Sequence, residues 1–442
     1  MAETLLSVGI DVGTSTTQLV VSRLRVENKA SAFSVPEMEI ADRQIFYQSP
    51  VHFTPLLGEQ RVDGDRIRDL IDAEYQKAGI CPADVDTGAI IITGETSRKE
   101  NARAVTEALS ARAGSFVVAT AGPDLESVLA AKGAGADRYS EETGEPVLHM
   151  DIGGGTANLA WIEGGRIVKT GCMNVGGRLI KLDDDGILTY VSPVLRGIFA
   201  KHTGEKPTMG ELEALAAKLA SALEMAAGLR PATDLLEALR TRETTQPWEP
   251  IVGELTLSFS GGVADCIGRR FAPLAFGDLG PILGQAIRNS ALCGRRYRLG
   301  EHTIRATVIG AGCHSAQLSG STVFYQHVTF PMKNLPVVTA VEELKRLDRP
   351  GVLALPGPDG GYEAVQAVAR QLAADCPSGP VYLAMERDAA KALGQALALR
   401  LGKERPILCI DRVRFGPQSY LDVGKPLSSA IPVVVKTLIL NQ

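Results

Sequence analysis

HMDIGGGTANLAW, residues 149–161, sets an acidic residue and three consecutive glycines between two strand-like runs. The apolar residues Val147, Leu148 and Met150 lead into the glycines, and residues 159–162 lead out of them toward a Gly-Gly turn at 164–165, which is the pattern of a β-hairpin. Glycines accept positive φ and carry no Cβ, so successive backbone N–H groups can converge on one anion. The stretch therefore predicts an anion-binding turn between two strands.

The anion expected at this turn is a nucleotide phosphate. A carboxylate at the end of the incoming strand can hold Mg²⁺ or orient the water that attacks phosphorus, so Asp151 is both a candidate metal ligand and a candidate catalytic residue. The stretch alone leaves open a plain glycine-rich hairpin in which Asp only forms the turn. The residues expected to bind the phosphates here are Gly153, Gly154, Gly155 and Thr156.

A second copy of this pattern near the N-terminus favours the phosphate site over the plain hairpin. A strand at residues 5–10 runs into an acidic residue and a Gly/Thr/Ser turn, and a second strand follows at 18–21. Neither G-x-G-x-x-G nor G-x-x-x-x-G-K-[ST] occurs, which excludes a dinucleotide or P-loop site of the strand-turn-helix type. The residues expected to bind the nucleotide and its metal here are Asp11, Gly13, Thr14, Ser15 and Thr16.

These two strand-turn-strand loops, led by Asp11 and Asp151, resemble those of the actin, Hsp70 and sugar-kinase superfamily. The resemblance implies an α/β fold with two ribonuclease-H-like domains that close on ATP and Mg²⁺, with both Asp residues near the metal. The alternation of strands and helices along the chain supports the same fold class independently.

Composition is that of an ordinary globular protein. The chain has 442 residues, 45% hydrophobic and 22% charged, with a net charge of -5. Scattered Lys and Arg give no basic stripe, so we expect no nucleic-acid partner, and no run reaches the roughly 18 apolar residues of a membrane span. The N-terminus lacks a basic leader, which predicts a cytoplasmic location. Seven widely spaced cysteines without a C-x-x-C pair read as core residues in a reducing compartment.

The chain divides into three expected parts. Residues 1–145 form the first ribonuclease-H-like half, with a helix at 65–78, a strand at 89–92, a helix from about 93 to 112, a strand at 115–120 and a helix at 124–132. Residues 146–322 form the second half, with a helical insertion at about 178–250. Residues 323–442 form a C-terminal α/β accessory domain. Glu95, after the strand at 89–92, is a second candidate catalytic carboxylate, although it could equally cap the helix.

Two further glycine turns are expected to contact the nucleotide. Gly261 and Gly262 follow a strand at 255–259 and would let backbone lie flat against adenine or ribose. Gly310 and Gly312 follow an expected strand at 304–309 and would form another such turn. His314 beside them has no His or Cys at ligand spacing, so we predict no metal site on it.

Several strings in this order resemble the ethanolamine ammonia-lyase reactivating factors: TGETSRKENAR (93–103), HMDIGGGTANLA (149–160), FSGGVADC (259–266), DLGPILGQAI (278–287), IGAGCHSAQLSGST (309–322), DVGKPL (422–427) and VKTLIL (435–440). The resemblance spans nearly the whole chain. It implies a chaperone-like reactivase and slow ATPase that binds the cobalamin-dependent lyase. With ATP and Mg²⁺ it would promote exchange of damaged cobalamin for intact adenosylcobalamin. Whether the chain forms a homodimer or enters a bacterial microcompartment is left open by the sequence.

Three alternatives belong to the same superfamily. A small-molecule kinase would need a substrate base and pocket in the first domain, and the sequence identifies neither. The activators of 2-hydroxyacyl-CoA dehydratases hold an iron-sulfur cluster through cysteines, and the absence of clustered cysteines argues against them. An actin-type filament or scaffold protein would also bind ATP, and concentration-dependent assembly with ATP would reveal it by sedimentation.

Overall fold

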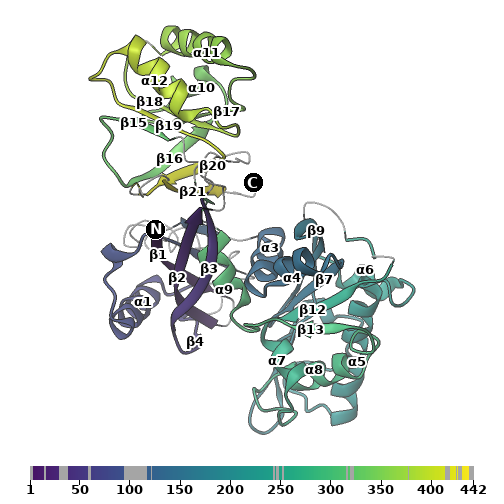
Figure 1. The fold of residues 1–442 in the computed structure, drawn as a ribbon. Helices are drawn as coiled ribbons and strands as arrows, with labels where there is room; N and C mark the ends of the chain where they lie inside the picture. The colour runs from purple at the N-terminus through teal and green to yellow at the C-terminus, as the bar shows by residue number, and fades with distance from the viewer. Residues whose placement is uncertain are drawn as a thin grey trace.

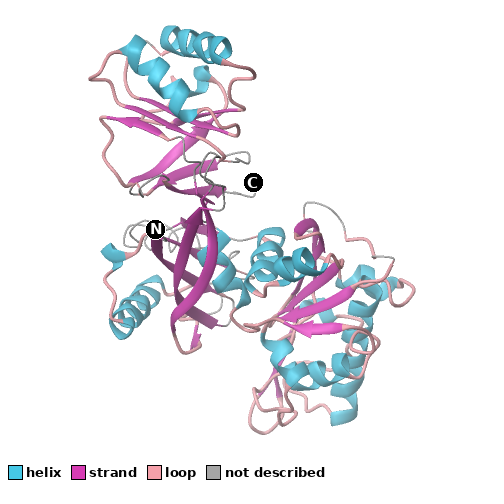
Figure 2. Cartoon of the chain, viewed as in Figure 1, coloured by secondary structure: helices cyan, strands magenta, loops and turns pink. Residues whose placement is uncertain are grey.

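The computed structural model describes residues 3–13, 16–28, 38–57, 61–93, 117–120, 122–241, 244, 248–250, 253–314, 317–318, 323–376, 378–413, 419–424, 426 and 431–437. Three parts follow one another along the chain, each with a central sheet and helices packed on it (Figures 1 and 2). None of the helices in these ranges combines the length and the hydropathy that crossing a bilayer would require.

The first sheet has the order β3-β2-β1-β5-β6, with β4 paired to β2. Strands β1, β2 and β3 are antiparallel neighbours, whereas β5 and β6 run parallel to β1. Its strands are β1 (Glu3–Val12), β2 (Thr16–Asn28), β3 (Met38–Gln48), β4 (His52–Phe53), β5 (Thr87–Ile92) and β6 (Val117–Thr120).

Helix α1 (Gly64–Ala78) lies between β4 and β5 and confirms the helix expected at 65–78. Asp63 caps its N-terminus by accepting a hydrogen bond from the Arg66 backbone N–H, and Gly79 ends it with φ of 67°. That left-handed conformation favours glycine. A short 3₁₀ turn, η1 (Pro82–Asp84), then leads into β5.

The second sheet repeats the topology of the first. Its order is β13-β12-β7-β8-β9, in which β7, β8 and β9 are antiparallel and β12 and β13 run parallel to β7. A three-stranded meander followed by two parallel strands is the ribonuclease-H-like pattern, so the chain contains two such domains. The strands are β7 (Val147–Ile152), β8 (Ala157–Glu163), β9 (Arg166–Met173), β12 (Thr256–Ser260) and β13 (Tyr297–Leu299).

An insertion between β9 and β12 packs on this second domain. Its longest helix begins with a capping box, in which the Thr208 side chain and Glu211 satisfy each other's backbone N–H groups. Trp248 is fully buried, and its indole N–H donates to the Ala226 carbonyl at 3.0 Å. The elements are β10 (Ile180–Leu182), β11 (Leu188–Val191), η3 (Pro193–Leu195), α5 (Met209–Ala226) and α6 (Asp234–Leu239), and α7 (Gly262–Gly268) and α8 (Gly280–Arg288) follow β12.

The helices at the end of each domain pack on the other domain's sheet. Helix α3 (Pro123–Gly133), followed by α4 (Ala136–Thr143), lies against β7, β8 and β9, whereas α9 (Ala306–His314) lies against β1, β2 and β5. The two helices cross at glycines: a Cβ on Gly133 would overlap the Ala306 carbonyl, and one on Gly310 would overlap the Leu129 carbonyl. Only glycine permits so close a backbone approach.

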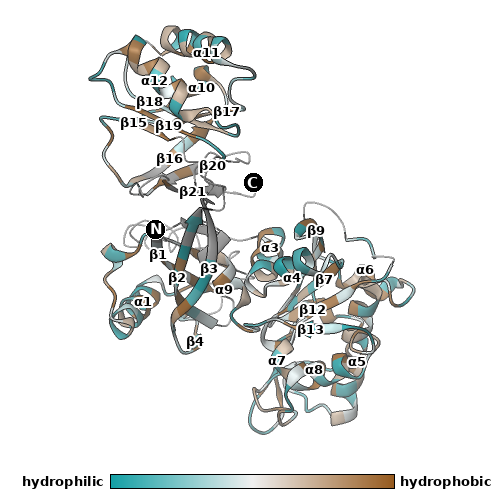
Figure 3. Cartoon of the chain, in the orientation of Figure 1, coloured by the Kyte–Doolittle hydropathy of each residue, from teal (hydrophilic) through white to brown (hydrophobic). Residues whose placement is uncertain are grey.

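The C-terminal part forms a mixed eight-stranded sheet of order β14-β21-β20-β16-β17-β18-β19-β15, in which β16 to β19 are parallel. Residues of β17 to β19 are drawn in hydrophobic brown in Figure 3, and helices cover them. The elements are β14 (Gln317–Leu318), β15 (Phe324–Gln326), β16 (Met332–Val338), α10 (Val341–Leu344), β17 (Val352–Leu355), α11 (Tyr362–Asp375), β18 (Val381–Met385), α12 (Ala390–Leu401), β19 (Ile407–Ile410), β20 (Ser419–Val423) and β21 (Pro432–Thr437).

The strand expected at 304–309 and the glycine turn at its end were wrong. Residues 306–314 form helix α9 instead, and the neighbouring sheet strand is β13, which the sequence did not indicate. The reason is tertiary: this β-branched, glycine-containing segment crosses α3, where a helix with glycine at the contact fits.

Candidate functional site

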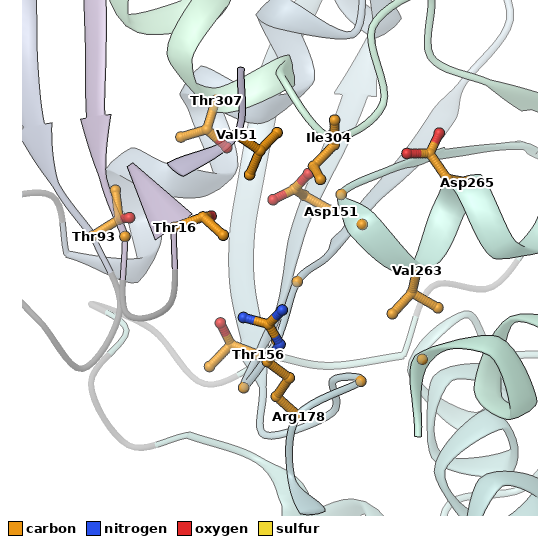
Figure 4. Close-up of a pocket in the computed structure, with 18 of the residues that line it drawn as sticks. Thr16, Val51, Thr93, Asp151, Thr156, Arg178, Val263, Asp265, Ile304 and Thr307 are labelled. Carbon is orange, nitrogen blue, oxygen red and sulfur yellow. The ribbon is translucent and has the colours of Figure 1, made fainter. Parts of the chain in front are cut away.

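A cavity of about 320 Å³ lies between the two ribonuclease-H-like domains. Thr16 and Thr93 reach it from the first domain, and Asp151 and Asp265 from the second (Figure 4). Of the residues predicted from sequence, those that line it are Asp11, Gly13, Thr16, Asp151, Gly153, Gly154, Gly155, Thr156, Gly261 and Gly262. The fold therefore brings both hairpin turns and the third glycine turn to one cavity.

The two hairpin turns have the same backbone closure. Gly13 N–H donates to the Thr16 carbonyl and Gly153 N–H to the Thr156 carbonyl, each at 2.9 Å. At Gly13 an added Cβ would lie 3.0 Å from the Thr16 oxygen, so a larger residue would disturb the turn. The described residues of both turns line the cavity, the first turn from the first domain and the second turn from the second domain.

Hydroxyl groups hydrogen-bond to the carboxylates of Asp11 and Asp151. Thr93 Oγ1 donates to Asp11 Oδ1 at 2.8 Å, and Ser260 Oγ donates to Asp151 Oδ1. Thr307 adds a further side-chain hydrogen bond to Asp151. These bonds fix the orientation of both carboxylates without supplying a positive charge.

His149 contacts Ser260, the residue that donates a hydrogen bond to Asp151. Its Nε2 lies 2.9 Å from Ser260 Oγ and its Nδ1 lies 3.0 Å from Ser258 Oγ, all fully buried. Because the Ser260 proton is directed to Asp151, Nε2–H must donate to Ser260, and Nδ1 accepts from Ser258. Burial lowers the pKa of His149 to about 3, so the ring is neutral and serves as a positioning group.

Both carboxylates are electrostatically poised for a cation. Burial raises the pKa of Asp11 to about 7, with the negative charge of Asp151 adding to the rise and the Thr93 bond opposing it. Burial likewise raises the pKa of Asp151 to about 6, against the hydrogen bonds from Ser260 and Thr307. A divalent ion beside them would favour the ionised forms and lower both pKa values again.

Two buried amide oxygens complete a set of hard ligands. Gln18 is the cross-strand neighbour of Asp11, and Asn158 is that of Asp151. Among the described residues, Gln18 Oε1 and Asn158 Oδ1 have no hydrogen-bond partner although both side chains are buried and line the cavity. Carboxylate and amide oxygens with space for water suit Mg²⁺, so the residues present fit a magnesium nucleotide.

The third glycine turn abuts the second hairpin. Gly261 has φ of 86°, and a Cβ there would overlap the Ile152 backbone. Its N–H donates to the Thr303 carbonyl at 2.8 Å. The turn thus brings bare backbone to the cavity wall, where a nucleoside could lie against it.

Several predicted residues do not reach the cavity or cannot be placed. Gly310 and Gly312 lie in helix α9, and Gly310 packs on Leu129 of α3 instead of facing the cavity. Thr14, Ser15 and Glu95 lie outside the described residues. Their roles stay predictions.

The cavity also contains residues that the sequence did not indicate: Gln18, Thr93, Glu126, Asn158, Arg178, Asp265, Phe271, Phe276, Asp278 and Thr307. One signal could have found two of them. Gln18 and Asn158 each follow the lead Asp of their loop by the same spacing, from 11 to 18 and from 151 to 158. The others depend on contacts between distant segments.

Comparison with known proteins identifies relatives over the whole chain. Residues 3–354 and 343–441 match the model of the family described as ethanolamine utilisation protein EutA. Two proteins named ethanolamine ammonia-lyase reactivase EutA, from Salmonella typhimurium strain LT2 and Escherichia coli strain K12, are each 39% identical over 465 residues. The alignment covers 98% of this chain and 98% of each relative.

Solved structures show weaker similarity. A Ppx/GppA family member from Aquifex aeolicus has a TM-score of 0.43 at 14% identity, covering 70% of this chain and 97% of that chain. The ethanolamine utilization protein EutJ from Carboxydothermus hydrogenoformans has a TM-score of 0.36 at 17% identity, covering 70% and 89%. The strand order of the two sheets, not these low-scoring superpositions, establishes the fold.

Proposed function

The chain belongs to the ethanolamine utilisation protein EutA family, and from that premise we propose that it is an ATP-dependent reactivase of ethanolamine ammonia-lyase. The observation that carries the proposal is its 39% identity, over 98% of its length, to two proteins named as such reactivases. The cavity lined by both hairpins supports the ATP dependence, because its glycine turns and oxygen ligands suit a polyphosphate and Mg²⁺.

In this proposal the two hairpin turns bind the phosphates through backbone N–H groups, and Asp11 and Asp151 face the metal. The bound Mg²⁺ would neutralise charge on the phosphates. Asp151, fixed by Ser260 and Thr307, positions or polarises the attacking water in a slow hydrolysis. Glu95 remains the second candidate for the carboxylate that acts on the attacking water.

The work of the reactivase is proposed to be cofactor exchange. Nucleotide-dependent movement of the two domains would loosen the lyase, so that damaged cobalamin leaves and intact adenosylcobalamin enters. Nucleotide can drive such movement only through different affinities for two conformations, and couplings of roughly 1–3 kcal/mol change partner affinity several-fold to about a hundredfold.

The test uses ethanolamine ammonia-lyase blocked with cyanocobalamin. Incubation with this protein, ATP and Mg²⁺ should release chemically unchanged cyanocobalamin into a filtrate, and lyase activity should return only when adenosylcobalamin is added. Omitting ATP or replacing this protein with albumin gives the controls. Recovery without added cofactor would mean repair in place, and no release in any mixture would refute the reactivase function.

We further propose that this protein is cytoplasmic and has no nucleic-acid or membrane partner. We also propose that it forms a homodimer and accompanies the lyase into a bacterial microcompartment. The lyase partnership is the support for the last point. Light scattering at increasing protein concentration tests the dimer and also the filament alternative, because a filament grows without limit whereas a dimer saturates.

A further inference from the structure

Arg178 is the only residue with a cationic side chain among the described residues that line the cavity. The acidic residues that line the same cavity are Asp11, Glu126, Asp151, Asp265 and Asp278. A polyphosphate entering so acidic a site needs positive charge from the protein as well as from a metal. Arginine is well suited, since its planar guanidinium can donate two parallel hydrogen bonds to a phosphate.

The Arg178 side chain is placed to reach a phosphate in the second hairpin. Its guanidinium lies beside Thr156 in Figure 4. Its aliphatic carbons pass over Gly154, where an added Cβ would lie 3.4 Å from Arg178 Cβ. The missing side chain at Gly154 therefore leaves room for Arg178 as well as for a ligand.

In this structure Arg178 is engaged by Asp278. Arg178 Nε donates to Asp278 Oδ2 at 3.1 Å, and the Asp278 side chain is only 8% exposed. The same carboxylate accepts from the Gly280 backbone N–H at 2.8 Å through Oδ1, at the start of helix α8. Asp278 thus links Arg178 to α8, which packs on α5 of the insertion.

The backbone around Arg178 makes the same connection. On one side, Gly177 N–H donates to the Gly153 carbonyl at 3.0 Å and Arg178 N–H to the Gly154 carbonyl at 2.6 Å. On the other, the Leu279 N–H donates to the Gly177 carbonyl at 2.8 Å. Gly177 and Arg178 therefore join the second hairpin turn directly to the beginning of α8.

We propose that Arg178 binds the terminal phosphate of the nucleotide and releases Asp278 when it does so, so that the contact at the start of α8 reports nucleotide state to the helical insertion. This proposal rests on the nucleotide function above. With ATP bound, Arg178 faces the terminal phosphate and Asp278 keeps only its bond to Gly280. With ADP or no nucleotide, Arg178 returns to Asp278.

The first experiment compares ATP and ADP binding by calorimetry in the wild type, Arg178→Gln and Arg138→Gln. Loss of a charge-assisted phosphate contact should weaken ATP binding by about 10- to 100-fold and ADP binding less than about threefold. Arg138 is the matched control because its pair with Glu301 is exposed and both residues lie outside the cavity lining. Equal weakening of ATP and ADP, or no weakening, would overturn the proposal.

Asp278→Asn gives the complementary variant. The amide oxygen can still accept from Gly280, but the competing ion pair is lost, so ATP should bind several-fold more tightly than to the wild type. Unchanged or weaker ATP binding in this variant would contradict the exchange of partners. Circular dichroism and thermal unfolding without ligand identify any variant that fails to fold.

Hydrogen exchange reports the proposed signal itself. In the wild type, ATP should change amide exchange at the start of α8 and along α5 relative to ADP, and Arg178→Gln should make the two profiles alike. Identical profiles in the wild type would overturn the signal. A wild type that binds neither nucleotide would instead refute the nucleotide function, which separates the two failures.

Discussion

Replacing Asp151 with Asn should stabilise the ligand-free second domain at alkaline pH. Burial raises the pKa of this carboxyl from 3.8 to about 6, so folding with the charge present is costly. Asn has the same shape and can still accept the hydrogen bond from Ser260, but it carries no charge. The substitution therefore removes the cost of burying a negative charge.

The sign and size of this stability change follow from the difference between the pKa values of Asp151 in the folded and unfolded states. Because the folded pKa lies above the unfolded one, the stabilising contribution is complete below about pH 4 and is lost as pH rises through about 6. The difference between 3.8 and about 6 corresponds to roughly 3 kcal/mol at 1.36 kcal/mol per pKa unit. Asp151→Asn should thus gain up to about 3 kcal/mol over the wild type at pH 8 but only about 1 kcal/mol near pH 4.5.

Tryptophan fluorescence during urea unfolding measures this effect in the right domain. The chain has two tryptophans, and both belong to the second domain: Trp161 in β8 and Trp248 in the core of the insertion. Their transition reports the domain that contains Asp151, even though a chain of three parts need not unfold in one step. Asp184→Asn, at an exposed position of the insertion, is the matched control.

Two results would refute this reasoning. A variant less stable than the wild type at pH 8 would mean that the charge of Asp151 is favourable in the ligand-free protein. A stability difference that is the same at pH 4.5 and pH 8 would mean that the effect has another cause. In the wild type, Mg·ATP should also stabilise the domain more than in the variant, because only the wild type regains a carboxylate–metal contact.

Three further predictions concern the loops and the crossing helices. Gly13→Val and Gly154→Val should each lower Mg·ATP affinity at least about tenfold in calorimetry, because a side chain enters a phosphate turn. Unchanged affinity in both variants would show that the two turns do not bind the phosphates. Asp151→Asn should retain nucleotide but lose most phosphate release, and full hydrolysis would transfer the catalytic role elsewhere. Gly310→Ala should destabilise the protein by several kcal/mol in thermal unfolding, since its Cβ would overlap a backbone oxygen of α3, whereas Gly210→Ala, which meets open space, should not.

The hairpin loops were predictable because their information is local and repeated. Each consists of an apolar strand, an acidic residue, a glycine-rich turn and a second strand, and the two sheets repeat that order. The strands β17, β18 and β19 of the C-terminal part likewise coincide with short runs of apolar residues. In each of these cases, the pattern and the tertiary environment favour the same structure.

Arg178 and helix α9 were not predictable because their roles depend on distant partners. Arg178 meets Asp278 across a hundred residues of chain, and nothing near it in sequence marks it as part of a phosphate site. The α9 segment contains three consecutive β-branched residues, 307–309, which favour a strand locally, and its glycines disfavour a helix interior. Its packing on α3 favours a helix, and Gly310, which was expected at the nucleotide, serves that contact instead.

The crossing of α3 and α9 limits how the two domains can move relative to each other. Each helix is joined to one domain and packed on the other domain's sheet, so the domains cannot separate without breaking both packings. Rotation about the crossing preserves them, because the glycines place backbone on backbone with no side chain between. A closure of the cavity that keeps both packings would therefore tilt the first sheet relative to the second. Strand β6, at the edge of the first sheet, lies against β21 of the C-terminal domain, so the same tilt would carry that domain with it.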